Sequence, residues 1–376
     1  MAKKQKKAPS QKEELFHFDP HVLMGSNLQT LPLFHTEWKK VGDKRRLIST
    51  PNKAMRRVHA VFERHLHEAI NLIGEVYGTG ETYTLRKLPS STGSVPSSNH
   101  FVNAEKHKGH RFFYITDFVH AYPSVDLDRL TKLLVLIFHY GKYQLDSGYS
   151  LRWFASNPLA QEMMTTDKLY LPLREFVRIA FSGPNNIGLA IGGPMSPRLL
   201  NLYCEVFLDS KLRALCERKG SKENTERTIT YTRYVDDLVF SRDIIIGSDL
   251  RREIRSLIND AGFSVNHRKS RVLDVKHGTV FVTKVGIENT GDKAVLRFPR
   301  WKRDRIEGVM KSYLATPAWN DSPEVIRGMI AEFLHYLRLV TPTETDKRTL
   351  NFCKEFKHAS HEYRKRYKNR HKPLRR

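Results

Sequence analysis

The sequence has few cysteines and no long apolar segment. Its 376 residues include only three cysteines, without Cys-x-x-Cys spacing, which argues against a structural zinc site or a disulfide framework. The longest apolar run, Leu133 to Phe138, is far too short to span a bilayer. No apolar segment follows the basic N-terminus, so a secretory signal is not expected. These absences predict a cytoplasmic protein without membrane contact.

Acidic residues are also scarce relative to basic ones. Lys and Arg number 64 against 40 for Asp and Glu, which gives a formal net charge of +24. A field this positive favours polyanions, and nucleic acid is the commonest of them. The alternatives are a ribosome-associated protein or a protein at a membrane surface. The length allows one large domain or two of modest size.

The first half of the chain contains helical and strand patterns. Apolar residues at helical spacing predict a helix over 54–74. Aromatic and β-branched residues predict a buried strand over 112–115, with Asp117 just beyond its end. A deeply buried helix should follow, from about residue 124 or 126 to residue 140. Residues 141–175 show no clear pattern and are interpreted as an insertion.

The second half begins with a helix and continues with a β-hairpin. Ser196-Pro197 is typical of an N-cap followed by a first-turn proline, and Gly220 is expected to end that helix. Residues 228–241 predict a hairpin with two aspartates at its tip. The remaining predictions are a helix over 249–261 closed by Gly262, a short β unit over 279–298, helices after Pro299, and loops over 89–98 and 221–227. This order predicts an α+β palm with a helical C-terminal domain.

Three aspartates are candidates for metal-dependent chemistry. Nucleotidyl transfer uses two divalent cations roughly 4 Å apart, and Mg²⁺ prefers hard oxygen ligands. Asp117 and Asp236 lie 119 positions apart but come together if their strands are neighbours, and Asp237 would lie beside them. An isolated Asp-Asp pair is usually just a turn. Here strand-forming residues flank the pair, Tyr234 precedes it, and a second strand leads to Asp117, so a metal site is favoured.

The hairpin sequence resembles a known family. Tyr234-Val235-Asp236-Asp237, within the run from Tyr231 to Ser241, is similar to the Tyr-x-Asp-Asp motif of reverse transcriptases, especially the bacterial retron and group II intron branch. Other segments resemble the family's motifs in the expected order. They are Arg46–Pro51, Asn103-Ala104-Glu105-Lys106-His107, Asp117–Val125, Gly192–Pro197 with Asn201 and Asp209, Gly262–Lys269 and Val282–Ile287. Together they cover roughly residues 44–300.

The resemblance implies a right-hand polymerase with fingers, an antiparallel palm sheet and a helical thumb. Its expected divisions are a basic flexible arm over 1–13, fingers and palm over 14–296, a thumb over 297–360 and a basic tail over 361–376. The implied activity is RNA-directed DNA synthesis with two Mg²⁺ ions, for which Mn²⁺ would be a substitute.

Roles for individual residues follow from the same resemblance. Asp117, Asp236 and Asp237 would hold the metals, helped by the carbonyl of Phe118. Lys269 would neutralise or protonate the leaving pyrophosphate. The nucleotide-binding residues would be Arg46, Tyr122, Gly192 and Pro194. Arg46, or else its neighbour Lys44 or Arg45, would clamp the triphosphate, the ring of Tyr122 would exclude a ribose 2′-hydroxyl, and Gly192 and Pro194 would lie beneath the nucleotide.

Nucleic acid would contact two further segments. Asn103 and His107 belong to a signature of retron enzymes, for which structural or RNA-contact use is favoured over chemistry. The thumb would grip a primer–template duplex through Trp301, Lys302, Arg303 and Arg305. The resemblance also implies a structured non-coding RNA as template or primer, an RNA–DNA duplex product, antiviral defence and a separate effector protein. It does not indicate an oligomeric state.

Two residues depart from the retron pattern and leave alternatives open. Ile191 stands where the family usually has Gln. The error-prone enzymes of diversity-generating retroelements also have Ile at this position. Lys284 replaces the glycine of Val-Thr-Gly. The first alternative is therefore a defence-associated or diversity-generating enzyme outside the true retrons. The second is an inactive palm retained as an RNA-binding scaffold, against which the intact aspartate set argues.

Overall fold

The chain folds into two compact units. The computed structural model describes residues 33–41, 44–73, 90–95, 98–139, 151–220, 228–290, 293–315 and 323–370. One unit comprises residues 1–99 and 114–272, and the other comprises residues 100–113 and 273–376. The predicted division of fingers and palm from thumb at residue 296 stays a prediction, because these units are defined by contacts along the chain. The predicted arm over 1–13 and the loop over 221–227 lie outside the described residues.

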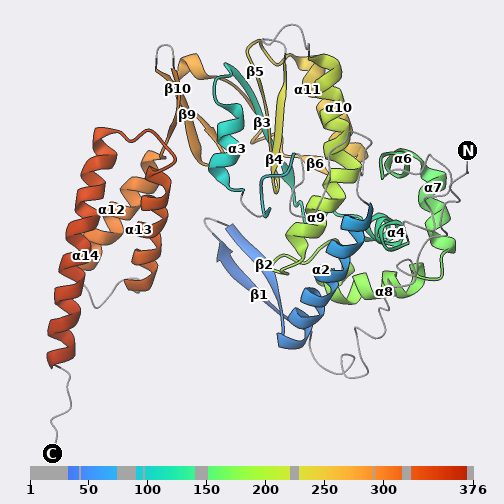
Figure 1. Ribbon diagram of the computed structural model, residues 1–376, viewed down its shortest axis with the longest axis horizontal. Coiled ribbons are helices and arrows are strands. Elements are labelled where there is room, and N and C mark those ends of the chain that lie inside the picture. The colour runs from blue at the N-terminus through green and yellow to red at the C-terminus, as the bar shows by residue number, and fades with distance from the viewer. Residues whose placement is uncertain are drawn as a thin grey trace, which may run out of the picture. The chain divides into compact units, whose positions relative to one another are not determined.

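The first unit is built on an antiparallel sheet (Figure 1). Its strands are β3 (Phe112–Val119), β4 (Thr230–Tyr234), β5 (Asp237–Arg242), β6 (Ser264–Val265) and β7 (Arg271–Asp274). The order is β4-β5-β3-β6, with β7 also paired to β3, and the pairs β4–β5 and β3–β6 are antiparallel. The predicted hairpin over 228–241 is therefore confirmed.

The predicted strand over 112–115 is too short. β3 continues to Val119, so Asp117 lies inside the strand and not beyond it. The reason is long-range pairing: the Asn266 N–H donates to the Asp117 carbonyl at 2.8 Å, and the Phe118 N–H donates to the Asp236 carbonyl at 3.1 Å. These bonds satisfy the backbone of a segment whose sequence alone favours a strand end.

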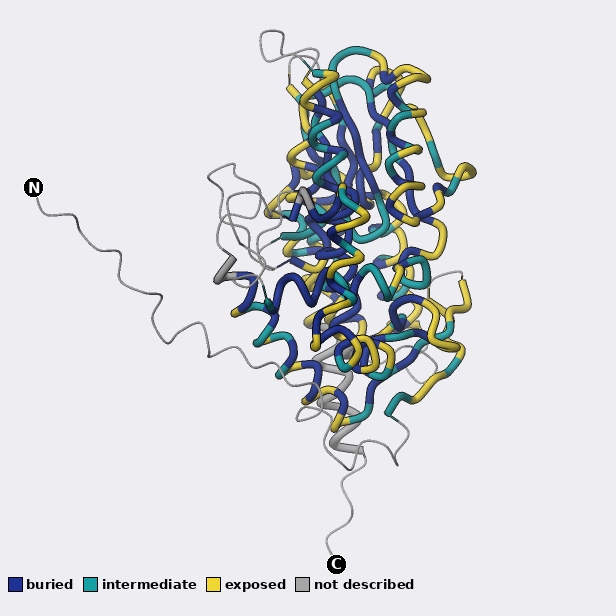
Figure 2. The backbone as a smooth tube through the Cα atoms, turned by 90° about the vertical axis from the view of Figure 1, so that its right-hand side faces the viewer, coloured by how far each residue is buried: buried dark blue, intermediate teal, exposed yellow. Residues whose placement is uncertain are grey.

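Helices pack against the sheet and share one hydrophobic core with it. Figure 2 shows the buried residues in dark blue. They are α2 (Lys53–Ile73), α4 (Leu127–Phe138), α6 (Leu151–Ser156), α7 (Pro158–Met163), α8 (Tyr170–Phe181), α9 (Ser196–Cys204), α10 (Ser210–Lys219) and α11 (Ser248–Asp260). The apolar residues of α4 are buried on nearly every side, as predicted. The segment 141–175, interpreted as an insertion, contains α6, α7 and the start of α8. A hairpin of β1 (Phe34–Val41) and β2 (Lys44–Pro51) precedes α2.

A π-helical turn, η4 (Glu205–Asp209), joins α9 and α10. This turn was not predicted, because its sequence continues the helical spacing of its neighbours. Ser196 is not the N-cap of α9 as predicted: Met195 occupies that position, and the Ser196 hydroxyl instead donates to the Ala190 carbonyl at 2.6 Å. Gly220 ends α10, and Gly262 follows α11 with a φ of +88°, so both glycine stops are confirmed.

The second unit combines a small sheet with helices. Its elements are α3 (His100–His107), β8 (Val280–Val282), β9 (Val285–Thr290), β10 (Lys293–Arg297), α12 (Arg300–Ala315), α13 (Pro323–Leu337) and α14 (Glu344–Arg370). The strands pair antiparallel in the order β10-β9-β8. Because α14 runs to Arg370, the segment assigned to a tail from residue 361 begins inside a helix. None of the helices that the structure describes is both long and apolar enough to cross a bilayer.

Candidate active site

The two aspartates of the hairpin lie at a tight turn. Tyr234 pairs with Asp237 across β4 and β5, so Val235 and Asp236 form a two-residue connection. Val235 has a φ of +58°, a conformation that is strained for a β-branched side chain. Strain of this kind persists only where surrounding contacts fix the backbone, and it is common at functional sites. The turn is therefore held in one conformation by its neighbours.

Asp117 lies beside this turn on the neighbouring strand. The hydrogen bond from the Phe118 N–H to the Asp236 carbonyl, at 3.1 Å, joins the two strands next to both aspartates. The Asp117 side chain is buried, and its Oδ1 atom has no hydrogen-bond partner among the residues that the structure describes. An unpaired buried carboxylate oxygen is costly unless a cation or a water completes it.

Lys269 supplies a positive charge at this point. Its backbone N–H donates to the Asn266 carbonyl at 3.0 Å, which fixes a turn just after β6. The exposed Lys269 side chain reaches back and its ammonium contacts Oδ2 of Asp117. That hydrogen bond, with further attraction from the carboxylates of Asp237 and Asp236, raises the pKa of Lys269. The predicted group of three aspartates and one lysine is thus brought together.

Tyr122 lies close to the same carboxylates. It follows β3 in a turn, where its carbonyl accepts a hydrogen bond from the Leu189 N–H at 2.8 Å. Burial, with a smaller effect from the charge of Asp236, raises the pKa of Tyr122 to about 12, so the hydroxyl stays neutral. The charge of Arg46, on β2, opposes this shift. Arg46 is itself exposed and near enough to Tyr122 to act on it.

The segment containing Gly192 and Pro194 packs against the β1–β2 hairpin. The Ser49 N–H donates to the Ile191 carbonyl at 2.7 Å. Gly192 has a φ of +103°, and a Cβ there would lie 2.7 Å from Cγ2 of Ile48, so a side chain is excluded. Gly192 and Pro194 are both exposed. A nucleotide therefore has steric access to both residues, and their contact with it stays a prediction.

The aspartates suit a hard divalent cation in their chemistry. Carboxylate oxygens are the ligands that Mg²⁺ prefers, and the unpaired Oδ1 of Asp117 is available for one. Within the described ranges, however, no three or more side chains of His, Cys, Asp or Glu are arranged as a metal cluster. In this arrangement it is the Lys269 ammonium that neutralises Asp117.

The side chains of Asn103 and His107 do not reach the surface. Both are fully buried on α3, so the predicted contact with nucleic acid does not occur in this arrangement. Asn103 instead donates to Oγ1 of Thr283 at 3.2 Å. Thr283 and Lys284 form the β8–β9 turn with φ values of +45° and +73°, which are unfavourable without glycine. The Asn103 amide therefore stabilises a strained turn within the second unit.

The four residues predicted for the thumb differ in accessibility. Trp301 and Arg305 are exposed on α12. Lys302 is partly buried, and its Nζ atom lies 2.7 Å from Oε1 of Glu332. Arg303 is buried and pairs with the buried Asp346 at 2.8 Å, so its prediction as a duplex contact is wrong. Its sequence position on a helical surface gave no sign of a partner 43 residues away.

A buried ion pair behind the hairpin was missed at the level of sequence. Arg233, which directly precedes Tyr234, is fully buried and binds the fully buried Asp209. Ser90 and Thr92, in a segment predicted as a loop, hydrogen-bond to the Arg233 backbone as an added edge of β4. A charged residue within a run of strand-forming Thr and Tyr residues is a usable signal, because charged residues are rarely buried without a partner.

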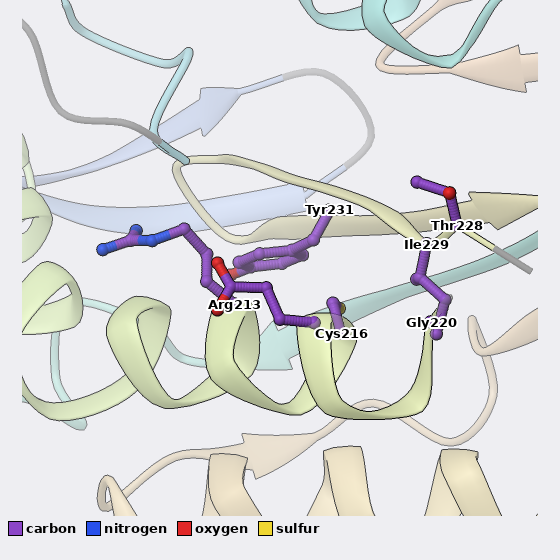
Figure 3. A pocket seen from close by; sticks show the side chains of 7 residues that line it. Arg213, Cys216, Gly220, Thr228, Ile229 and Tyr231 are labelled. Atoms are coloured by element: carbon purple, nitrogen blue, oxygen red, sulfur yellow. The ribbon is translucent and has the colours of Figure 1, made fainter. Parts of the chain in front are cut away.

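A pocket lies on the other side of this pair. It is lined by Arg213, Cys216, Glu217, Gly220, Thr228, Ile229 and Tyr231. Tyr231 reaches from β4 toward the helix (Figure 3), and its hydroxyl donates to Asp209 at 2.7 Å. None of the predicted site residues lines this pocket, so the chemistry is expected at the aspartates and not here.

Comparisons with known proteins agree with this geometry. The reverse transcriptase (RNA-dependent DNA polymerase) family matches residues 38–291. The Retron Mx65 reverse transcriptase of Myxococcus xanthus is 27% identical over 263 residues, which are 69% of this chain and 53% of that protein. The chain thus spans about half the length of this curated relative.

Solved structures of telomerase are also similar. Telomerase from Candida albicans, in complex with a TWJ fragment of telomeric RNA, aligns with a TM-score of 0.44 and 11% identity over 89% of this chain and 64% of that one. The corresponding complex from Candida tropicalis aligns with a TM-score of 0.40 and 12% identity over 80% and 52% of the two chains. Because the family match covers well over half of the sequence and includes every aspartate of the site, the chain belongs to the reverse transcriptase family and has its α+β right-hand polymerase fold.

Proposed function

We propose that the protein is an RNA-directed DNA polymerase that extends a 3′-hydroxyl with deoxynucleoside triphosphates. The observation that carries the proposal is the junction of β3 with the hairpin turn. The Phe118-to-Asp236 hydrogen bond places Asp117 beside the Asp236-Asp237 pair, and Lys269 contacts Asp117. Separate strands and the turns that follow them thus bring three carboxylates and the Lys269 ammonium close together.

Asp117, Asp236 and Asp237 would hold two Mg²⁺ ions, with the Phe118 carbonyl as a further ligand. Bound there, the metals would activate the attacking hydroxyl and neutralise the triphosphate, and Mn²⁺ would serve as a substitute. Contact with Asp117 raises the pKa of Lys269, so its ammonium keeps its charge and is suited to neutralise the departing pyrophosphate. Proton donation from Lys269 to the pyrophosphate is the other role that the family resemblance implies.

The residues around the carboxylates would select and hold the nucleotide. Tyr122, half-buried and neutral, would lie under the sugar, where its ring excludes a ribose 2′-hydroxyl. The exposed guanidinium of Arg46 would bind the triphosphate as a planar fork. Gly192 and Pro194 would form the surface beneath the nucleotide.

The template would be RNA, in keeping with the family. The excess of positive charge supports binding of a polyanion, and Trp301, Lys302 and Arg305 would contact the RNA–DNA duplex. We further propose, from the resemblance of its motifs to retron enzymes, a structured non-coding RNA as template or primer and a role in antiviral defence with a separate effector protein. The low cysteine content favours a cytoplasmic location. Sequencing the nucleic acid that co-purifies with the protein tests this part. One recurrent structured RNA supports it, and random cellular RNA contradicts it.

The chemistry is tested by a primer-extension assay. Purified protein is incubated with a primed RNA template, Mg²⁺ and labelled deoxynucleotides, beside an Asp236→Ala variant of equal thermal stability. We expect extension by the wild type and none by the variant. If the folded wild type binds the template but makes no product, the RNA-binding scaffold is the better description.

A further inference from the structure

The catalytic hairpin rests on a buried polar network. The Arg233 side chain is completely inaccessible, as is that of Asp209 in the π-helical turn η4. Nε of Arg233 donates to both Asp209 oxygens, at 3.0 and 3.1 Å, and Nη2 donates to Oδ2 at 2.8 Å. Tyr231 adds a hydrogen bond to Oδ1 at 2.7 Å. This pairing anchors the guanidinium but uses only one side of it.

The opposite side of the guanidinium is directed at the turn. Nη1 of Arg233 donates to the carbonyl of Val235 at 2.9 Å and to Oδ1 of Asn201 at 3.0 Å. Asn201, from α9, in turn donates through Nδ2 to the carbonyl of Gly93 at 2.8 Å. Val235 is the residue with the strained positive φ, one position before Asp236. A rigid chain of hydrogen bonds thus runs from helix η4 to the backbone of the turn.

Core stability alone does not account for this arrangement. Taking an arginine and an aspartate out of water is costly, and a buried ion pair is often no more stable than apolar residues of similar volume. The planar fork of arginine, by contrast, can hold two acceptors in fixed positions at once. π-Helical turns are also frequent at functional sites, and here the turn contributes Asp209.

We propose that Arg233 is a positioning residue for the reaction: anchored by Asp209 and Asn201, it holds the Val235 carbonyl and so fixes Asp236 and Asp237 relative to Asp117. Arg233 touches neither substrate nor metal in this role. The effect on rate rests on the proposed polymerase function, whereas the effect on the turn itself does not.

Two variants separate positioning from stability. In the triple variant Asp209→Leu/Tyr231→Phe/Arg233→Met, the ion pair and its tyrosine partner become apolar together, so it should be more stable than Arg233→Met alone, which leaves Asp209 buried and unpaired. The Val235 carbonyl and Asn201 Oδ1 still lose their donor, so part of the wild-type stability is lost. We expect its kcat to stay about 100-fold below wild type, as for a misplacement of about 1 Å, with little change in KM for the deoxynucleotide. Arg233→Lys keeps the charge beside Asp209 but cannot hold Asn201 and Val235 together. It should fold and show a similar loss of kcat.

A matched control is available elsewhere in the same unit. Asp167 is also a buried carboxylate, and it accepts from the Leu169 N–H at 2.8 Å and lies 3.1 Å from Nδ1 of His139. Asp167→Asn should lower the unfolding temperature while leaving kcat unchanged. The proposal is overturned if kcat simply follows thermal stability across the variants. It is also overturned if either the triple variant or Arg233→Lys has the wild-type kcat.

A second readout does not depend on activity. Amide hydrogen exchange over residues 234–238 should be faster in Arg233→Lys and in the triple variant than in the wild type and Asp167→Asn. Unchanged exchange over these residues would overturn the positioning role even if no preparation were active. If the wild type is inactive but exchange is faster in the variants, the proposed polymerase function is rejected. The role of Arg233 in holding the Val235 carbonyl is then still supported.

Discussion

Gly93 offers a direct way to displace the catalytic turn without touching a charged group. A Cβ at this position would lie 2.7 Å from both the backbone nitrogen and Cγ2 of Val235, and 3.1 Å from the carbonyl carbon of Tyr234. Ordinary contacts begin at 3.4 Å, so the Val235 backbone must move by about 0.7 Å to admit the methyl group of Gly93→Ala. The obstacle is backbone, which cannot rotate away as a flexible side chain would.

The expected losses differ between rate and stability. Overpacking costs about 1–3 kcal/mol, and replacing glycine by alanine recovers about 0.4–1 kcal/mol from the unfolded state, since Gly93 has no positive φ. Unfolding should thus become easier by about 0–2.6 kcal/mol. The displacement of Asp236 should lower kcat by about 10- to 100-fold.

The assay is single-nucleotide incorporation with thermal unfolding measured on the same preparations. Gly247→Ala is the matched control, because a Cβ at Gly247 meets nothing within 4 Å and its φ of −67° is ordinary. It should leave kcat unchanged, and its effect on stability should be only the modest cost of alanine at the N-cap of α11. A wild-type kcat in Gly93→Ala would refute the idea that close packing behind the turn sets the rate.

Three further predictions test other features. Tyr122→Ala should incorporate ribonucleotides that the wild type rejects. The measurement is the ratio of kcat/KM for deoxynucleotides to that for ribonucleotides. An unchanged ratio would show that the Tyr122 ring does not exclude the ribose 2′-hydroxyl. Burial raises the pKa of Cys204 and Cys216 to about 12 and that of Cys353 to about 11. The three thiols of the native protein should therefore react slowly with iodoacetamide at pH 8. Rapid labelling, detected by mass spectrometry, would contradict their burial. Burial also lowers the pKa of His107 to about 3, so its contribution to stability is present above its unfolded pKa of about 6.5 and is lost as pH falls toward 3. His107→Gln should therefore reduce the acid dependence of unfolding by up to about 4–5 kcal/mol, and an unchanged pH profile would argue against a neutral buried imidazole.

Local patterns predicted the elements that depend on local interactions. The helix over Leu127–Phe138, the hairpin around Asp236 and the glycine stops at Gly220 and Gly262 follow from side-chain periodicity and backbone preference. The motif resemblance also placed Asp117 and Lys269 with the hairpin pair, and the structure brings them together.

Features that depend on distant partners were not predictable in this way. Aspartate disfavours strands, yet β3 continues through Asp117 because Asn266 and Asp236 complete its backbone hydrogen bonds. Arg303 appears as a surface cation in a sequence, and the strand pattern around Arg233 does not name its partner, so only the folded chain brings each arginine to a buried aspartate. Asn103 is similar, since its partner Thr283 lies 180 residues away.

The most direct test of the central claim is the rate of single deoxynucleotide incorporation on a primed RNA template with Mg²⁺. The rate is measured for the wild type, Asp117→Asn and Asp236→Asn, with matched thermal stabilities. We expect extension by the wild type and loss of it in both variants, because each variant removes one carboxylate charge from the point where the two strands meet. Extension by either variant at the wild-type rate would contradict it.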